Sequence, residues 1–215
     1  MKHVFFEPWV GKNYKTGISG KKIMVMGHVH VCGGCDKCGV VKEAEECAHF
    51  TRGSVTKYLK WRETGEVPSK GYDGWLNTYL NFAKAFFGYE PDTIEKENEL
   101  WDYILFYNYV QTSVRNWNEK PSKSDYENSQ KPFLEVINKY EPDIIIVWGK
   151  PAYDNAPGGG NEEKPIKFED VEAKCYSYTL TSGKRCTMIS IHHPSMLFSF
   201  FKWHEIIKKT LTKRL

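Results

Sequence analysis

Four short apolar runs, each followed directly by glycine or polar residues, constrain the fold of this chain more than any other feature of its sequence. They cover residues 21–27, 103–107, 142–149 and 187–191. Runs of this length and composition are typical of strands that are buried on both faces of a parallel sheet. Helical patterns alternate with them along the chain. This alternation predicts an α/β fold, a three-layer αβα sandwich with a mostly parallel central sheet.

The helices are predicted from apolar residues that recur every three or four positions. The clearest pattern runs from residue 75 to residue 87, and Gly88 is expected to end that helix. Further helices are predicted over residues 50–58, 95–101, 124–140 and 196–211. The third of these should begin near Ser122 or Ser124, and Pro132 marks either a kink or a later start.

The remaining segments have the composition of loops. Residues 1–20 show no clear period and are expected to form an arm or loop that lies on the body of the protein. Residues 65–74 are predicted to form a loop, and the Gly-rich, charged residues 155–164 a mobile surface loop.

A hairpin is predicted near the C-terminal end of the chain, where Ser182-Gly183 indicates a two-residue turn between two strands. In that register Cys186 lies opposite Thr179, and Cys175 lies opposite Ser190. We therefore expect no disulfide between the two cysteines, which should be ordinary buried residues.

Length and composition indicate one domain over residues 1–215. The hydrophobic share of 40% is that of an ordinary globular protein, and no apolar run approaches the ~20 residues of a membrane helix. Residues 1–8 are too short and too soon interrupted to form a signal peptide. We expect a cytoplasmic monomer that has no membrane partner.

A pair of histidines follows the last apolar run, in the segment His192-His193-Pro194-Ser195. Proline cannot continue a strand ladder, so the chain should leave the sheet at this point. The pair would then lie at the carboxyl end of a core strand. In open α/β sheets this edge is where ligands bind.

A cluster of cysteines follows the first apolar run: Cys32, Cys35, Cys38 and Cys47, with His28, His30 and His49 nearby. Repeated Cys-x-x-Cys spacing lets a turn direct two thiolates at one ion. Four thiolates suit a structural zinc ion or an iron–sulfur cluster. Reduced thiols without a metal and a redox pair remain the alternatives.

Four motifs at or near the ends of the apolar runs carry a resemblance to a known family: Gly27-His28-Val29-His30-Val31-Cys32, His49-Phe50-Thr51, Leu105-Phe106-Tyr107-Asn108-Tyr109 and His193-Pro194-Ser195-Met196-Leu197. In this order, over roughly residues 20–205, the chain resembles the uracil-DNA glycosylase superfamily. Its cysteines make it similar to an uncharacterised, cysteine-containing bacterial branch. The resemblance implies a DNA glycosylase of base excision repair that needs no cofactor for its chemistry.

The resemblance also implies roles for individual residues. Phe50 would stack on a flipped base, while Gly27 and Asn108 would help to bind it. His193 would donate a hydrogen bond toward O2 of the departing base. The DNA contacts would come from Pro194, Ser195 and Leu197, with Ser195 holding phosphate and Leu197 acting as a wedge in the base stack.

Val29 stands where the family carries a water-positioning Asp or Asn. His28 or His30 would have to substitute as a base, or would instead be metal ligands. Two alternatives therefore stay open. One is a non-catalytic protein of this fold that binds nucleic acid, a nucleotide or a protein. The other is a thiol- or metal-dependent enzyme centred on His28, His30 and Cys32.

Overall fold

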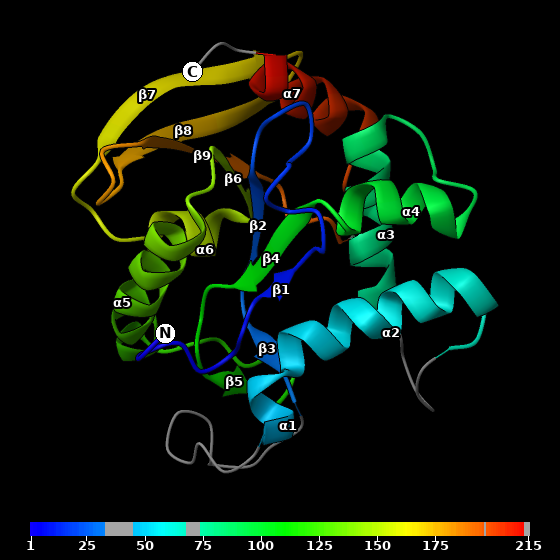
Figure 1. Cartoon of the computed structure of the whole chain (residues 1–215), viewed down its shortest axis with the longest axis horizontal. Helices are drawn as coiled ribbons and strands as arrows, with labels where there is room; N and C mark the ends of the chain where they lie inside the picture. The colour runs from blue at the N-terminus through cyan, green and yellow to red at the C-terminus, as the bar shows by residue number, and fades with distance from the viewer. Residues whose placement is uncertain (33–44, 68–73, 196, 213–215) are drawn as a thin grey trace.

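The computed structural model describes residues 1–32, 45–67, 74–195 and 197–212 and has an α/β architecture (Figure 1). Within these residues, seven strands form one sheet in the order β1-β4-β2-β6-β9-β8-β7, and β3 and β5 form a separate pair. The strands are β1 (Trp9–Val10), β2 (Ile23–Gly27), β3 (His30–Val31), β4 (Ile104–Asn108), β5 (Ser113–Val114), β6 (Ile144–Trp148), β7 (Asn161–Phe168), β8 (Val171–Thr179) and β9 (Arg185–Ile191).

The four central strands, β4, β2, β6 and β9, run parallel to one another. They coincide with the four apolar runs of the sequence, and β2, β4 and β6 are buried along their whole length. At the edges, β1, β8 and β7 each pair in the antiparallel sense with their neighbour. The predicted α/β fold with parallel central strands is confirmed, and the complete sheet is mixed.

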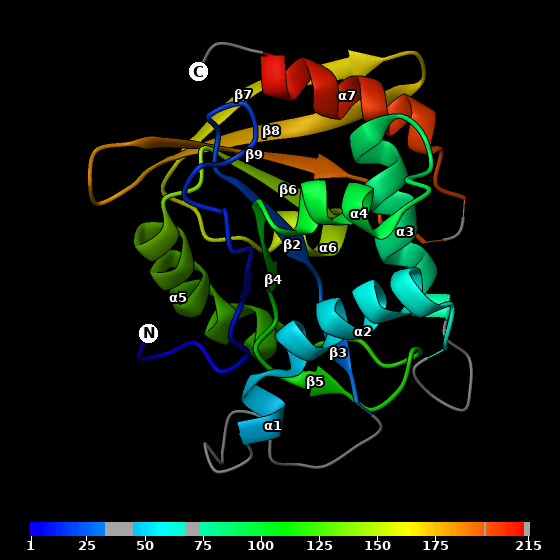
Figure 2. The ribbon, with the colours of Figure 1, turned by 45° about the vertical axis from the view of Figure 1, so that its right-hand side comes forward.

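Helices pack on both faces of this sheet, as Figures 1 and 2 show. One face carries α2 (Phe50–Thr64), α3 (Gly74–Phe87), α4 (Ile94–Trp101) and α7 (Phe200–Thr212), and α1 (Glu45–Ala48) precedes α2. The other face carries α5 (Lys123–Tyr140) and α6 (Lys150–Asp154). Ile144 faces the first group and Ile145 the second, because successive strand side chains point to opposite faces. No helix in the described part of the chain is long and apolar enough to span a membrane.

The start of α5 agrees with the sequence prediction. Ser122 is its N-cap: Ser122 Oγ accepts from the backbone N–H of Asp125 at 3.2 Å, and Asp125 Oδ2 accepts from the backbone N–H of Ser122 at 2.7 Å. This reciprocal arrangement is a capping box. The helix continues through Pro132 to Tyr140, so the proline does not mark a later start.

Two predicted helices have different bounds in the structure. The helix predicted over 50–58 continues to Thr64, where Gly65 ends it in the left-handed conformation at φ 71°. The helix predicted from residue 196 begins at Phe200 instead, and Met196 lies outside the described residues. Leu197 has a φ of 61°, which a right-handed helix cannot contain.

The predicted hairpin exists, but its register differs by one residue. Leu180 N–H donates to Lys184 O at 2.8 Å, which leaves a three-residue loop that ends in Gly183 at φ 82°. Cys186 therefore lies opposite Tyr178 rather than Thr179, and Cys175 opposite Ile189 rather than Ser190. The two cysteines are buried and are not cross-strand partners, as expected.

Other segments predicted as loops contain strands. β7 begins at Asn161, inside the predicted loop 155–164, and pairs with β8 at the edge of the sheet. Its charged residues are compatible with an edge strand, which is partly open to water. In the N-terminal arm, β1 pairs with β4 and Phe6 is 1% exposed, so the arm lies on the body as predicted. Part of the predicted loop 65–74, residues 68–73, lies outside the described residues.

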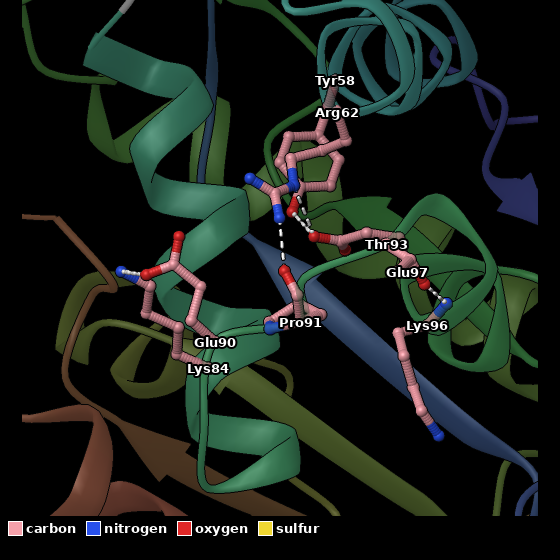
Figure 3. A network of polar contacts seen from close by, with 8 residues as sticks. All are labelled: Tyr58, Arg62, Lys84, Glu90, Pro91, Thr93, Lys96 and Glu97. Atoms are coloured by element: carbon pink, nitrogen blue, oxygen red, sulfur yellow. Dashed lines mark hydrogen bonds and ion pairs between the residues drawn. The ribbon is translucent and has the colours of Figure 1, made fainter.

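A buried carboxylate links α2 to α4 (Figure 3). Glu97 is 0% exposed, and its Oε1 accepts from Tyr58 OH at 2.7 Å and from Arg62 Nε at 2.9 Å. Arg62 Nη2 donates in addition to Pro91 O. Burial raises the pKa of the Glu97 carboxyl by more than the contacts with Tyr58 and Arg62 lower it. The network fixes α2, which carries Phe50 at its first position.

Candidate functional site

A pocket of about 210 Å³ opens at the carboxyl edge of the parallel strands. Gly27 ends β2, Asn108 ends β4 and Trp148 ends β6, and His193 follows β9 by two residues. Six of the residues predicted from the sequence line it together: Gly27, His28, His30, Phe50, Asn108 and His193. Ligands bind at this edge in open α/β sheets.

Gly27 makes room for the side chain of Asn108. The two residues are paired in register between β2 and β4. A Cβ atom at Gly27 would overlap Asn108 Oδ1 and lie 3.1 Å from Phe106 Cζ. Asn108 is 6% exposed, and its backbone oxygen accepts from Gln111 Nε2 at 2.9 Å. The Asn108 side chain therefore lies buried against Gly27, where it lines the pocket.

Replacing Gly27 with alanine should displace the Asn108 amide, because the added methyl group occupies the place of Oδ1. If Asn108 binds the substrate base, we expect kcat/KM for uracil-containing DNA to fall by about 10²-fold, as a displacement of about 1 Å can produce. The matched control is Gly53→Ala in α2, where nothing lies within 4 Å of an added Cβ atom. Equal kcat/KM values for the two variants would contradict this account.

His30 lies behind Asn108 and is 4% exposed. Asn108 Nδ2 is 3.0 Å from its Nδ1 and 3.1 Å from its Nε2, and Thr51 Oγ1 is 2.9 Å from its Nε2. The rings of Phe6 and Phe50 pack against it edge-on, with centroids 4.7 and 4.5 Å away. Burial lowers the pKa of His30 to about 3, so its ring is neutral at neutral pH. These contacts favour a positioning role over a base.

His28 follows Gly27 directly, just beyond the carboxyl end of β2. Its Nε2 is 2.7 Å from Tyr126 OH, and the two rings stack with centroids 5.7 Å apart. Burial, and to a smaller extent His193, lowers the pKa of His28 to about 4. Val29 also lines the pocket, and none of the described lining residues is Asp or Glu. Of the two histidines predicted to substitute as a base, His28 is the less deeply buried and is therefore the better candidate.

The lowered pKa of His28 predicts how stability depends on pH. An unfolded histidine titrates near 6.5, so between pH 6.5 and about 4 the unfolded chain binds more protons than the folded one. The free energy of unfolding should therefore decrease as the pH falls through this range. His28→Phe, which keeps a ring beside Tyr126, should reduce that slope by up to one proton. Urea unfolding at pH 7, 5.5 and 4.5 measures it; an unchanged slope would contradict a buried, neutral His28.

His193 lies at the mouth of the pocket. Its ring stands edge-on to Trp148, with centroids 6.3 Å apart, and its Cβ lies 3.4 Å from where a Cβ at Gly149 would be. Its backbone oxygen accepts from Ser195 N–H at 2.7 Å. The side chain is partly open to solvent. The desolvation of its buried part lowers the pKa of His193. A neutral ring can donate one hydrogen bond into the pocket.

Aromatic rings contribute to the rest of the wall, and those of Tyr79, Phe106 and Trp148 are buried. Trp148 Nε1 is buried and has no hydrogen-bond acceptor among the described residues. Trp75 and Trp117 also line the pocket, and Trp117 is 67% exposed. Neither tryptophan was predicted as a site residue, because its position at the pocket depends on how its segment packs against the sheet.

The three residues predicted to contact DNA lie outside the pocket. Pro194 is buried, and its oxygen accepts from Asn81 Nδ2 at 3.1 Å. Ser195 is exposed, and Leu197 is 99% exposed. All three follow His193 in the sequence, and none of them lines the pocket. Their predicted roles stay predictions.

The predicted metal site falls partly on residues that the structure does not describe, because Cys35 and Cys38 lie outside the described ranges. Cys32 Sγ is 2.9 Å from Ser113 Oγ, and Cys47 lies in α1. Among the described residues, no three or more His, Cys, Asp or Glu side chains are grouped as metal ligands. A zinc ion or an iron–sulfur cluster at these cysteines therefore stays a prediction.

Comparisons with known proteins assign the chain to no family. No family model matches the chain, and a search of curated proteins finds no match.

Proposed function

We propose that this protein is a DNA glycosylase of uracil-DNA glycosylase type, with a three-layer αβα fold. It hydrolyses the N-glycosidic bond of uracil, or of another deaminated base, in DNA. The observation that carries the proposal is that Gly27, Phe50, Asn108 and His193, from four separate segments, line one pocket. We place it in the cytoplasm as a monomer that needs no cofactor for its chemistry.

The pocket has the size and wall of a site for one flat ring. Its volume of about 210 Å³ lies below the ~300–1,000 Å³ of pockets that bury drug-sized ligands. Aromatic faces from Phe50, Tyr79 and Trp148 suit stacking against a base. A base inside a duplex must leave the stack to reach such a pocket.

Two polar groups would act on the base in this proposal. Asn108 carries both a donor and an acceptor, which matches the O4 and N3–H edge of uracil. His193 would donate toward O2, where negative charge develops as the glycosidic bond breaks. The bond between C1′ and N1 breaks with its electron pair leaving on the base, and water adds to C1′. His28 is the candidate for taking the proton of that water.

DNA would be held around the mouth of the pocket. The exposed ring of Trp117 and the side chain of Lys57 line the pocket, and Ser195 and Leu197 lie beyond His193. A lysine supports phosphate contact, and large apolar side chains support contact with unstacked bases.

A second candidate is a non-catalytic protein of the same fold that binds uracil-containing nucleic acid. The observation in its favour is Val29, together with the lack of Asp or Glu among the described pocket residues. Such a protein would bind the base and leave the glycosidic bond intact.

One assay separates these candidates. The purified protein is incubated with single- and double-stranded oligonucleotides that carry one uracil, hypoxanthine or xanthine, and the products are treated with alkali. If the protein is a glycosylase, we expect alkali-labile breaks at the uracil position. Tight binding of uracil-containing DNA without breaks would support the non-catalytic candidate. Neither breaks nor binding would end both proposals.

A further inference from the structure

We propose that Trp117 is a second stacking site, for the nucleotide next to the one whose base enters the pocket, and that this site makes the protein prefer single-stranded DNA. The inference rests on the proposed function, because it specifies which form of DNA the same pocket takes. It adds a contact that lies outside the four motifs of the sequence.

Trp117 is open to solvent although it lines the pocket. It is 67% exposed, whereas the other six tryptophans of the chain, all within the described residues, are buried or partly buried. A single exposed tryptophan on a surface needs no explanation. One that borders a pocket of aromatic rings extends the apolar surface of that pocket into the solvent, where a ligand can cover it.

A hydrogen-bonded turn holds the backbone of Trp117 in place. Asn118 N–H donates to Asn116 Oδ1 at 2.9 Å, and Glu119 N–H donates to Asn116 O at 3.2 Å. The Glu119 carboxylate accepts in addition from the backbone N–H of Arg115. A tryptophan side chain has only two torsions to fix. On a fixed backbone it is therefore a surface on which a base can stack at a low cost in conformational entropy.

The lining of the pocket also offers the two kinds of contact that a single strand needs. Phe50 and Trp75 line it and are partly exposed. Lys57 lines it as well, is exposed, and forms no ion pair with the described residues. Proteins that bind single strands combine aromatic rings for the bases with positive side chains for the backbone. The described lining contains both and has no Asp or Glu that would repel phosphate.

The size of the pocket separates the two stacking sites. A volume of about 210 Å³ suits one ring, which the proposed function assigns to the target base stacked on Phe50. The solvent-exposed part of Trp117 is then left for a neighbouring base. In a duplex that neighbour stays stacked, and only its edges reach the grooves. In a single strand it can turn one face to the indole ring.

Binding of DNA that cannot be cleaved tests this site. The probe is a short oligonucleotide with one 2′-fluoro-deoxyuridine at its centre, alone or annealed to its complement, and fluorescence anisotropy gives both dissociation constants. We expect the wild-type chain to bind the single strand more tightly than the duplex. Trp117→Ala should weaken single-strand binding about tenfold and change duplex binding by less than about twofold. Trp117→Phe, which keeps a stacking face, should restore most of the lost affinity.

Tyr89→Ala is the matched control, because Tyr89 is 48% exposed and does not line the pocket. We expect it to leave both dissociation constants unchanged. The fluorescence of the wild-type chain gives a second measurement that depends on no variant. Trp117 is the tryptophan most open to a soluble quencher. The bound single strand should therefore protect the emission from acrylamide more than the bound duplex does.

The outcomes separate this site from the proposed function. Equal losses of single-strand and duplex binding in Trp117→Ala would overturn the preference, and a larger loss for the duplex would make Trp117 a wedge in the base stack instead. Breaks at uracil together with unchanged binding by Trp117→Ala would overturn this site and leave the glycosylase proposal standing. The expected loss for the single strand, in a protein that produces no breaks, would end the glycosylase proposal and leave this site standing.

Discussion

Replacing His193 with alanine is expected to lower kcat for uracil release by about 10²–10³-fold, the usual effect of removing one donor to a developing negative charge. The ring lies at the mouth of the pocket and packs edge-on against Trp148. Affinity for uracil-containing DNA should change little, because the donor acts mainly in the transition state. Single-turnover release from a uracil oligonucleotide measures the rate, and a fluorescence titration measures the affinity.

The neighbouring histidine provides the matched control. His192 is exposed and packs against Trp203, with centroids 4.9 Å apart, and it is not among the pocket-lining residues. We expect His192→Ala to retain the wild-type rate. A His193→Ala variant with the full rate would remove His193 from the mechanism.

Replacing Arg62 with methionine is expected to lower the free energy of unfolding by about 3–5 kcal/mol, because it leaves a buried carboxylate without its cation. Glu97 is fully buried, and Arg62 is its charged partner at 2.9 Å (Figure 3). The loss should be largest at neutral pH. It should shrink as the pH falls toward the raised pKa of Glu97, where the carboxyl takes up a proton. Urea unfolding at pH 7 and pH 5 measures both effects.

An exposed ion pair in α4 is the control for this change. Lys96 Nζ lies 2.8 Å from Glu99 Oε1, and both side chains are largely open to solvent. Lys96→Met should lower the free energy of unfolding far less than Arg62→Met does, because exposed ion pairs contribute little to stability. If Arg62→Met costs no more than Lys96→Met, the buried network does not stabilise the fold as argued.

The sheet and the position of the pocket could be predicted because their signals are local. Each central strand is a continuous apolar run, since helices cover both faces of the sheet. The carboxyl ends of parallel strands meet at one edge, so residues that end separate runs lie together. The place of His193 was predicted in this way and that of Asn108 from the family resemblance, and both residues line the pocket.

The contacts that hold the site together have no such local signal. His30 and Asn108 are 78 residues apart, and their contact depends on the separate pairing of β3 with β5. Tyr126, which contacts His28, belongs to α5, on the face of the sheet opposite to α2. In the hairpin, Thr181-Ser182-Gly183 suits a two-residue or a three-residue loop, and the choice shifts every partner by one residue.

A crystal structure with an oligonucleotide that carries a hydrolysis-resistant 2′-fluoro-deoxyuridine would test the central claim most directly. We predict the uracil ring inside the pocket, stacked on Phe50, with N3 within about 3 Å of Asn108 Oδ1 and O2 facing His193. A uracil that stays in the duplex stack, or one bound elsewhere on the protein, would contradict the account.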